Sequence, residues 1–295
     1  MTARGAPGRV SVILAGRRRG LPIVTGYEDT PGGHDALVLG AQLSRLTGLG
    51  AVVATVYPAD ARGLAAVARD PRWIPRAQKV ARARFARARA IIGEGWGEAE
   101  PVFAALGPGS VALVLTEYAD EVGAAVLVVG STGHGLLGRL APGRTVQRLL
   151  PMARCPVAIA PRGYRHTLST GMTVVTVAYD GSPESDRAAA VAVHLASRTG
   201  AALRFVTVAE TDDEVAAAQA IVHKGLASAP VEVDALADVV VGPVARVLAD
   251  LPERTDVLVV GSRGYRMMRR VLLGGVAGVL VRTARYPVVV VPGHS

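Results

Sequence analysis

The chain has 295 residues, enough for one large or two ordinary domains. Half of the residues are hydrophobic and 19% are charged, which is the composition of a globular protein and excludes a disordered chain. The net charge of +9 is concentrated in residues 1–171, which carry 21 basic and 11 acidic side chains, whereas the remainder carries 12 and 13. The apolar runs are shorter than the ~20 residues of a membrane span, so we expect no membrane partner.

Residues 1–20 form a basic N-terminal extension. Its apolar run, residues 10–16, is followed by three arginines, a flank that is unlike a cleaved export signal. The single cysteine, Cys155, cannot form a disulfide within the chain. We therefore expect a cytoplasmic protein in which Cys155 serves as a small, inert hydrophobic residue before a buried strand.

Short apolar runs alternate with segments of helical spacing along the rest of the chain. The first part predicts strands near 21–27, 51–57, 101–106, 124–130 and 156–160, with a helix over 35–47. The second part predicts strands near 173–179, 202–209, 230–236, 255–261 and 287–291, with helices over 184–199 and around Val244, Val247 and Leu248. Short, mostly apolar runs are typical of strands that are covered on both faces.

Residues 75–92 are predicted to form a basic surface helix. Ala81, Phe85, Ala88 and Ile92 share one helical stripe, which we expect to face the protein while the arginines face water. A nucleic-acid surface would interleave aromatic and basic side chains, and only Phe85 lies inside this run. A nucleic-acid or membrane contact stays the alternative, but we expect no sequence-specific nucleic-acid binding.

The chain contains an internal repeat. The sequence VLVVGS occurs at 126–131 and again at 257–262, an offset of 131 residues. Two glycines and a proline recur at the same offset: Gly133 and Gly264, Gly143 and Gly274, Pro156 and Pro287. The repeat predicts two similar domains, residues 21–163 and 172–295, which are joined by a linker at 164–171. The first domain is longer in its second helical region.

The alternation of strands and helices predicts an α/β fold of two tandem doubly wound domains, each an open five-stranded parallel sheet with flanking helices. Ligands of such sheets bind beyond the carboxyl ends of the strands, at a switch point. The last strands, 156–160 and 287–291, would leave unpaired apolar edges, which favour aggregation. We therefore expect these two strands to pair with each other and form an internal pseudo-dimer.

The loop after the fourth strand has the spacing Gly-x2-Gly-x9-Gly in both copies, at 130–143 and 261–274. Small residues at a strand end let a ligand approach the backbone, whose N–H groups can bind phosphate. A helix that begins near the last glycine would direct its N-terminal dipole at the same anion. The alternative is that the glycines only turn a tight connection, but the repetition favours a ligand site.

These motifs resemble the universal stress protein family over residues 21–293: YDGSP with Asp180, VLVVGSRG, the glycine spacing, and the final strands CPVAIAP and YPVVVVP. The resemblance implies the fold that this family shares with adenine nucleotide alpha hydrolases. It also implies ATP or another adenine nucleotide, with or without Mg²⁺, between the first-strand and fourth-strand loops. The nucleotide-binding residues that it implies are Ala178, Asp180, Gly261, Arg263, Gly264, Gly274, Gly275 and Val276 in the second copy, and Glu28, Gly130, Gly133, Gly143, Arg144 and Thr145 in the first.

Both copies depart from the family's ATP pattern, in which Ser or Thr follows the last glycine. Arg144 and Gly275 stand there instead, and Glu28 replaces the first-strand aspartate that Asp180 preserves. We therefore expect the second copy to be the better ATP site. Accordingly, Gly264→Val should abolish nucleotide retention, and the matching change at Gly133 should matter less.

The resulting hypothesis is a tandem universal stress protein that binds ATP and acts as a non-enzymatic stress-response regulator. Two alternatives stay open: a slow ATP hydrolase on the same fold, and an interaction module whose pockets bind no nucleotide. A homodimer also stays open.

The histidines lack paired metal-ligand spacing, so we expect no metal site. His194 is predicted to pack in the core or at its boundary, and His134, in the glycine loop, is a ligand contact or a plain loop residue. The GHGLLG of residues 133–138 follows the fourth strand, which argues against a dinucleotide fingerprint.

Overall fold

A computed structural model of the protein describes residues 12–14, 21–58, 73–93, 95–96, 100–131, 144–167, 171–251, 254–262 and 275–293. Its first half contains the strands β1 (Val12–Leu14), β2 (Ile23–Gly26), β3 (Ala51–Pro58), β4 (Val102–Gly109), β5 (Val126–Gly130) and β6 (Val157–Ala160). The helices of this half are α1 (Pro31–Thr47), α3 (Trp73–Ile92), α4 (Val111–Glu121) and α5 (Arg144–Leu149), followed by the short 3-10 helix η1 (Tyr164–His166).

The second half repeats this order of elements. Its strands are β7 (Val174–Ala178), β8 (Ala202–Ala209), β9 (Ala235–Val241), β10 (Val257–Gly261) and β11 (Val288–Val291). Its helices are α6 (Pro183–Thr199), α7 (Val215–Ala227), α8 (Val244–Ala249) and α9 (Gly275–Thr283), with the 3-10 helix η2 (Asp212–Glu214) before α7.

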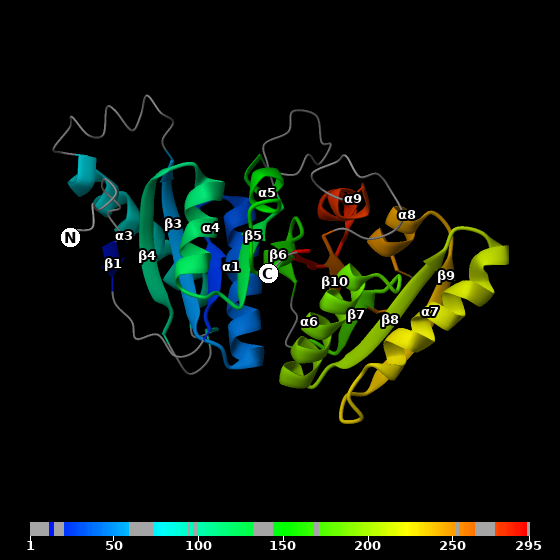
Figure 1. Ribbon diagram of the computed structural model, residues 1–295. Helices are drawn as coiled ribbons and strands as arrows, with labels where there is room; N and C mark the ends of the chain where they lie inside the picture. The colour runs from blue at the N-terminus through cyan, green and yellow to red at the C-terminus, as the bar shows by residue number, and fades with distance from the viewer. Residues whose placement is uncertain are drawn as a thin grey trace, which may run out of the picture.

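The described strands form one sheet in the order β1-β4-β3-β2-β5-β6-β11-β10-β7-β8-β9 (Figure 1). Within each half, five strands run parallel, and their order across the sheet is third, second, first, fourth, fifth. This is the doubly wound arrangement, in which the chain reverses direction across the sheet between its first and fourth strands. The predicted α/β class and the predicted parallel sheets are confirmed.

The two halves are joined by antiparallel pairing of their last strands, as predicted. Ala158 of β6 lies opposite Val289 of β11, with Ile159 opposite Val288 and Val157 opposite Val290. Because the strands are parallel within each half and antiparallel at the junction, the two halves point in opposite directions. The strands of one half therefore end where those of the other half begin, so the carboxyl ends of the two sets lie at opposite ends of the common sheet.

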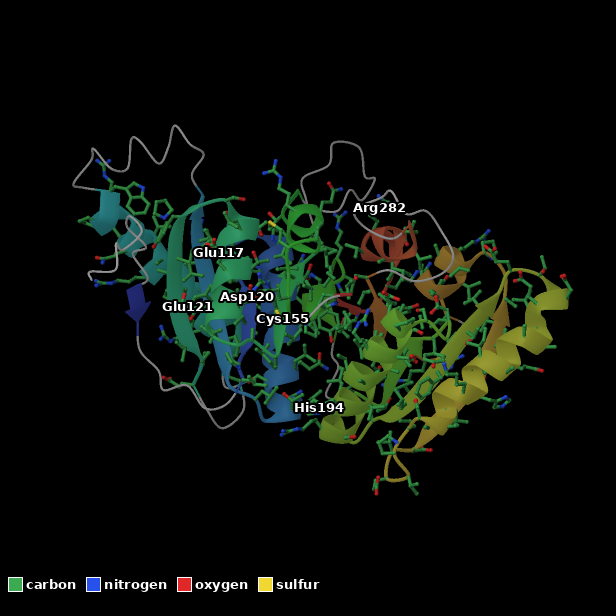
Figure 2. The ribbon with its side chains drawn as sticks, viewed as in Figure 1. Glu117, Asp120, Glu121, Cys155, His194 and Arg282 are labelled. Carbon is green, nitrogen blue, oxygen red and sulfur yellow. The ribbon has the colours of Figure 1, made fainter. Side chains whose placement is uncertain are left out.

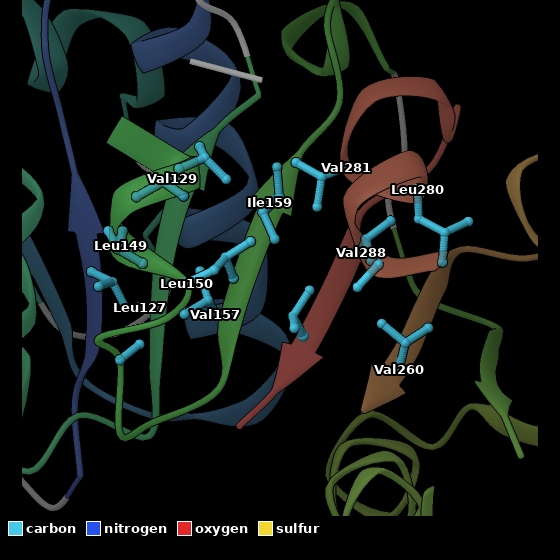
Figure 3. Packing of buried hydrophobic residues seen from close by; sticks show 14 of the residues in the cluster. Leu127, Val129, Leu149, Leu150, Val157, Ile159, Val260, Leu280, Val281 and Val288 are labelled. Atoms are coloured by element: carbon cyan, nitrogen blue, oxygen red, sulfur yellow. The ribbon is translucent and has the colours of Figure 1, made fainter. Parts of the chain in front are cut away.

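Each face of the sheet carries equivalent helices from both halves. The helices α4, α5, α8 and α9 pack on one face, where they share a single apolar core with both sets of strands. Figure 3 shows side chains of this core: Leu127, Val129, Val157, Ile159, Val260 and Val288 from the strands, Leu149 of α5 with the adjoining Leu150, and Leu280 and Val281 from α9. The helices α1, α3, α6 and α7 cover the other face.

Matching signals begin and end the helix after the first strand of each half. Thr30 and Ser182 are the N-caps, and each side chain accepts a hydrogen bond from the backbone N–H three residues later, at 3.2 and 3.1 Å. A proline follows each cap, and a left-handed glycine, Gly48 or Gly200, ends each helix.

The segment after β6 is anchored to α1 by a buried carboxylate. Asp35 accepts hydrogen bonds from the backbone N–H of Gly163 at 3.0 Å and of Arg165 at 2.9 Å, and its Oδ1 also accepts from Arg165 Nη1 at 3.0 Å. Tyr164 donates its hydroxyl proton to Gln42 of α1. The connection between the halves therefore begins as a turn that is fixed to the first half.

Two elements differ from the sequence prediction. The third strand of the second half lies at Ala235–Val241 and not at 230–236. Residues 230–233 form a turn, closed by Val233 N donating to Pro230 O at 3.1 Å, and Val231 is 98% exposed. Within the N-terminal extension, β1 pairs antiparallel with β4 and adds an unpredicted strand to the sheet.

Two further side-chain predictions have opposite outcomes (Figure 2). His194 of α6 was predicted to be packed but is exposed, because the buried stripe of that helix is formed by Ala188, Ala192 and Ala196. Cys155 packs beside the shared core, and burial, together with the charge of Asp120, raises the pKa of its thiol to about 11. Its thiolate is therefore disfavoured at neutral pH, as expected for an inert cysteine.

The described helices include no segment with both the length and the hydropathy needed to cross a membrane.

The β6–β11 junction gives a direct stability prediction. Val289→Asp places a carboxylate in the buried centre of the pairing, within an apolar cluster, and should lower the free energy of unfolding by about 3 kcal/mol or more. The matched control, Val231→Asp, adds the same charge at an exposed turn and should change it by less than about 0.5 kcal/mol. Urea unfolding followed by circular dichroism measures both, and equal midpoints would contradict the assigned pairing.

Candidate functional site

Each half has a switch point where its first and fourth strands lie side by side. In the first half β2 pairs with β5, and in the second half β7 pairs with β10, both in parallel register. The chain leaves β2 toward α1 and leaves β7 toward α6, so the N-terminus of each helix lies at the same edge. Ligands of doubly wound sheets bind at this position.

In the second half, Asp180 directly follows the end of β7 and is held by the next turn. Its Oδ1 accepts hydrogen bonds from the backbone N–H of Ser182 at 3.1 Å and from the hydroxyl of Ser182 at 2.5 Å. Gly181 between them has φ +75, a left-handed conformation that favours glycine. The same Ser182 oxygen caps α6, so the carboxylate has a fixed position beside the helix N-terminus.

Tyr179 fixes the end of β7 from the other side. Its N–H donates to the carbonyl of Val206 at 2.8 Å, and its own carbonyl accepts from the hydroxyl of Thr207 at 2.7 Å. Its phenol is buried and donates to Asp186 at 2.6 Å. Burial first, and then the carboxylate of Asp186, raises the pKa of Tyr179 to about 12. The phenol therefore stays neutral and serves as a rigid support for the turn that carries Asp180.

The last residue of the fourth strand lies close to the helix that follows the first strand in both halves. A Cβ on Gly261 would lie 3.0 Å from the carbonyl oxygen of Glu184 in α6. A Cβ on Gly130 would lie 2.1 Å from the carbonyl oxygen of Gly32 in α1. These two glycines therefore allow close packing of strand and helix, which is a structural role independent of any ligand.

In the first half, the acidic residues after β2 are paired with basic side chains. The Oε1 of Glu28 lies 3.4 Å from Arg84 Nη2. The Oδ1 of Asp29 lies 2.7 Å from His34 Nε2 and 4.0 Å from Arg87 Nε. The ring of His34 also stacks on Tyr27, with ring centroids 6.2 Å apart. Burial, together with the charge of Asp29, raises the pKa of Tyr27 to about 12. Tyr27 and Tyr179 therefore occupy equivalent buried positions, but the acidic residues that follow them have different partners in the two halves.

Arg84 is the site residue that the sequence analysis missed. It was expected to face water with the other arginines of α3, but its Nη1 donates to the buried hydroxyl of Thr55 at 2.8 Å. Ala81, Phe85 and Ala88 are buried as predicted, and Ile92 is partly buried. Residue 84 lies three positions after Ala81 and four before Ala88, so helical spacing already places it on the packed side.

The structure describes nine of the predicted nucleotide-binding residues. Ala178, Asp180 and Gly261 lie together at the second switch point, and Glu28 and Gly130 lie at the first. The helices α9 and α5 begin where expected, at Gly275–Val276 and at Arg144–Thr145. Five predicted residues, Gly133, Gly143, Arg263, Gly264 and Gly274, lie outside the described residues, as does His134. In the described part of the chain, no three His, Cys, Asp or Glu side chains are grouped as metal ligands.

The comparisons with known proteins agree with this architecture. The sequence model of the Universal stress protein family matches residues 21–161 and 172–292. The chain therefore belongs to the universal stress protein family and carries two of its domains in tandem.

One curated relative and two solved structures show what this chain is similar to. A universal stress protein of Mycobacterium tuberculosis strain H37Rv is 31% identical over 204 residues, which are 62% of this chain and 70% of the relative. The crystal structure of a universal stress protein from Archaeoglobus fulgidus covers 92% of this chain and 98% of its own, with a TM-score of 0.68 and 18% identity, and so shows the same fold. A universal stress protein crystallised in complex with cAMP is 28% identical and covers 41% of this chain and 98% of its own, with a TM-score of 0.34.

The two strand-end glycines give a matched stability prediction. Gly130→Ala should lower the free energy of unfolding by about 2 kcal/mol, because the new methyl group would overlap the backbone of α1. Gly261→Ala needs a much smaller shift of α6 and should cost less than about 1 kcal/mol. Urea unfolding of both variants tests the difference, and a larger loss in Gly261→Ala would contradict the observed packing.

Proposed function

We propose that this tandem universal stress protein is a non-enzymatic regulator that binds an adenine nucleotide, ATP, in its second domain. The observation that carries the proposal is the fixed carboxylate of Asp180 at the second switch point, held by Ser182 beside the N-terminus of α6. The family resemblance, which implies a nucleotide between the loops after the first and fourth strands, supports this proposal.

The chemistry of the described residues suits the two ends of such a ligand. The exocyclic amine of adenine and the hydroxyls of ribose are hydrogen-bond donors, and an ionised carboxylate is an acceptor. Asp180 therefore suits the base or the ribose. The phosphates require N–H donors and positive potential, which a helix N-terminus provides. The helix α9 begins at Gly275, directly after the glycine loop, and supplies such a terminus.

A regulator that binds ATP without turnover fits the hydrogen-bonding state of the acidic residues. Hydrolysis requires a carboxylate that orients a water molecule or holds a metal ion at the phosphates. Asp180 is proposed at the base or ribose end of the ligand and not at the phosphates, and Glu28 and Asp29 are paired with Arg84 and His34. We therefore expect binding without measurable release of phosphate.

The test compares two matched carboxylate variants of the full chain. Asp180→Ala removes the proposed acceptor and should weaken ATP binding by about tenfold or more, as for loss of a hydrogen bond to a charged group. Glu28→Ala changes the equivalent residue of the first domain and should leave ATP affinity unchanged. Isothermal titration calorimetry measures the affinities, and native mass spectrometry of freshly purified protein identifies the retained nucleotide.

The outcomes separate the proposal from its alternatives. Equal losses in the two variants would mean two working sites, and an unchanged affinity in Asp180→Ala would remove the second-domain site. Phosphate release that depends on Asp180 would assign a hydrolase. A chain that binds no ATP in either assay would be an interaction module.

A further inference from the structure

We propose that Arg84 closes the nucleotide site of the first domain, so that the insertion in that domain decides which half of the chain binds ATP. This inference rests on the proposed function, because it assumes that nucleotide binds at the switch points. Arg84 belongs to α3, the helix that lies in the longer region of the first domain. Its guanidinium bridges Thr55 of β3, at 2.8 Å, and Glu28 after β2, at 3.4 Å.

The second domain provides an internal control for this arrangement. Thr55 and Thr207 occupy matching positions, one residue beyond the carbonyl that binds Tyr27 or Tyr179. Thr207 donates its hydroxyl to the backbone of its own domain, whereas Thr55 accepts from Arg84. The turn at Gly181 faces Ile221 of α7, whose Cγ2 lies 3.5 Å from a Cβ placed on that glycine. An apolar side chain thus borders the turn in the second domain, and a guanidinium borders it in the first.

Arg84 is held in place by the packing of its helix. Ala81, Phe85 and Ala88 of α3 are buried in a core that also contains Tyr27 and Phe103, and the rings of Phe85 and Phe103 lie 4.9 Å apart. The side chain of Arg84 is only 20% exposed, whereas that of its partner Glu28 is 63% exposed. The ion pair itself adds little stability at that exposure, so the position of the guanidinium depends on α3 and on the buried hydroxyl of Thr55.

The guanidinium cannot take the role proposed for Asp180 at the base and ribose end of a nucleotide. It offers only N–H donors, so it cannot accept a hydrogen bond from the adenine amine as a carboxylate does. Glu28, the acceptor of the first domain, is already turned toward Arg84. A nucleotide would have to displace the guanidinium and leave the buried hydroxyl of Thr55 without its donor, so binding to the first domain is disfavoured.

The test counts the ATP molecules bound per chain in calorimetric titrations of the full protein. The wild type should bind one. Arg84→Ala should bind a second ATP, because the affinity of the first domain rises by at least about tenfold. The matched control, Arg82→Ala, removes an exposed arginine from the same helix and should leave the count at one. Circular dichroism and the urea midpoint verify that each variant is folded.

A second variant keeps the closure testable if Arg84→Ala does not fold. Arg84→Gln keeps a helix-favouring, partly aliphatic side chain but removes the terminal nitrogens that contact Thr55 and Glu28, and it should also bind a second ATP. To locate the gained site, Asp180→Ala is combined with each change at Arg84, and the double variants should keep one ATP.

The two proposals fail in different ways. A count that stays at one in both Arg84 variants, while Asp180→Ala alone loses binding, would overturn the closure and leave the second-domain site intact. Two ATP molecules in the wild type would also overturn the closure. Binding that Asp180→Ala does not change would instead overturn the proposed function.

Discussion

The antiparallel pairing of β6 with β11 is the constraint on which the rest of the molecule depends. Each half alone would present an apolar last strand at an open sheet edge, and Val157–Ala160 and Val288–Val291 are buried throughout. Pairing them satisfies the backbone groups of both edges and makes one continuous core from α4, α5, α8 and α9. Because the pairing is antiparallel, it also places the two switch points at opposite edges of the sheet. Two ligand sites in this chain, one at each switch point, would therefore lie at opposite ends of the sheet.

Duplication lets the two halves be compared position by position. Tyr27 and Tyr179 have the same backbone hydrogen bond, 2.8 Å to the neighbouring strand, and both are buried. The residues around them have diverged. Asp186 accepts from the phenol of Tyr179, whereas His34, 152 residues earlier, stacks on the ring of Tyr27. Likewise Asp35 anchors the connection after β6, whereas the matching Arg187 pairs with Glu184 within α6. The scaffold positions are therefore shared, and the polar contacts have been reassigned in each half.

The parts of the fold that the sequence predicts are those with a strong local pattern. The repeated VLVVGS marks the fourth strands, and the Pro-led apolar runs mark the last strands and their pairing. The third strand of the second half was misplaced because residues 230–241 contain two overlapping alternations, and only tertiary contacts with β8 select the later one. Similarly, β1 lies in a run of three residues whose partner, β4, is far away in sequence. A contact of that kind has no local signal.

The candidate site was predictable only in part, for a related reason. The sequence identifies Asp180 from the YDGSP motif, because a carboxylate after the first strand of such a sheet lies at the switch point. It does not identify Arg84, because a long basic side chain on an amphipathic helix is compatible with either solvent or a buried acceptor. The deciding contact, Arg84 to Thr55, joins α3 to a strand, and α7, the corresponding helix of the second half, places the apolar Ile221 near the turn instead. The contact that distinguishes the two first-strand ends therefore lies in α3.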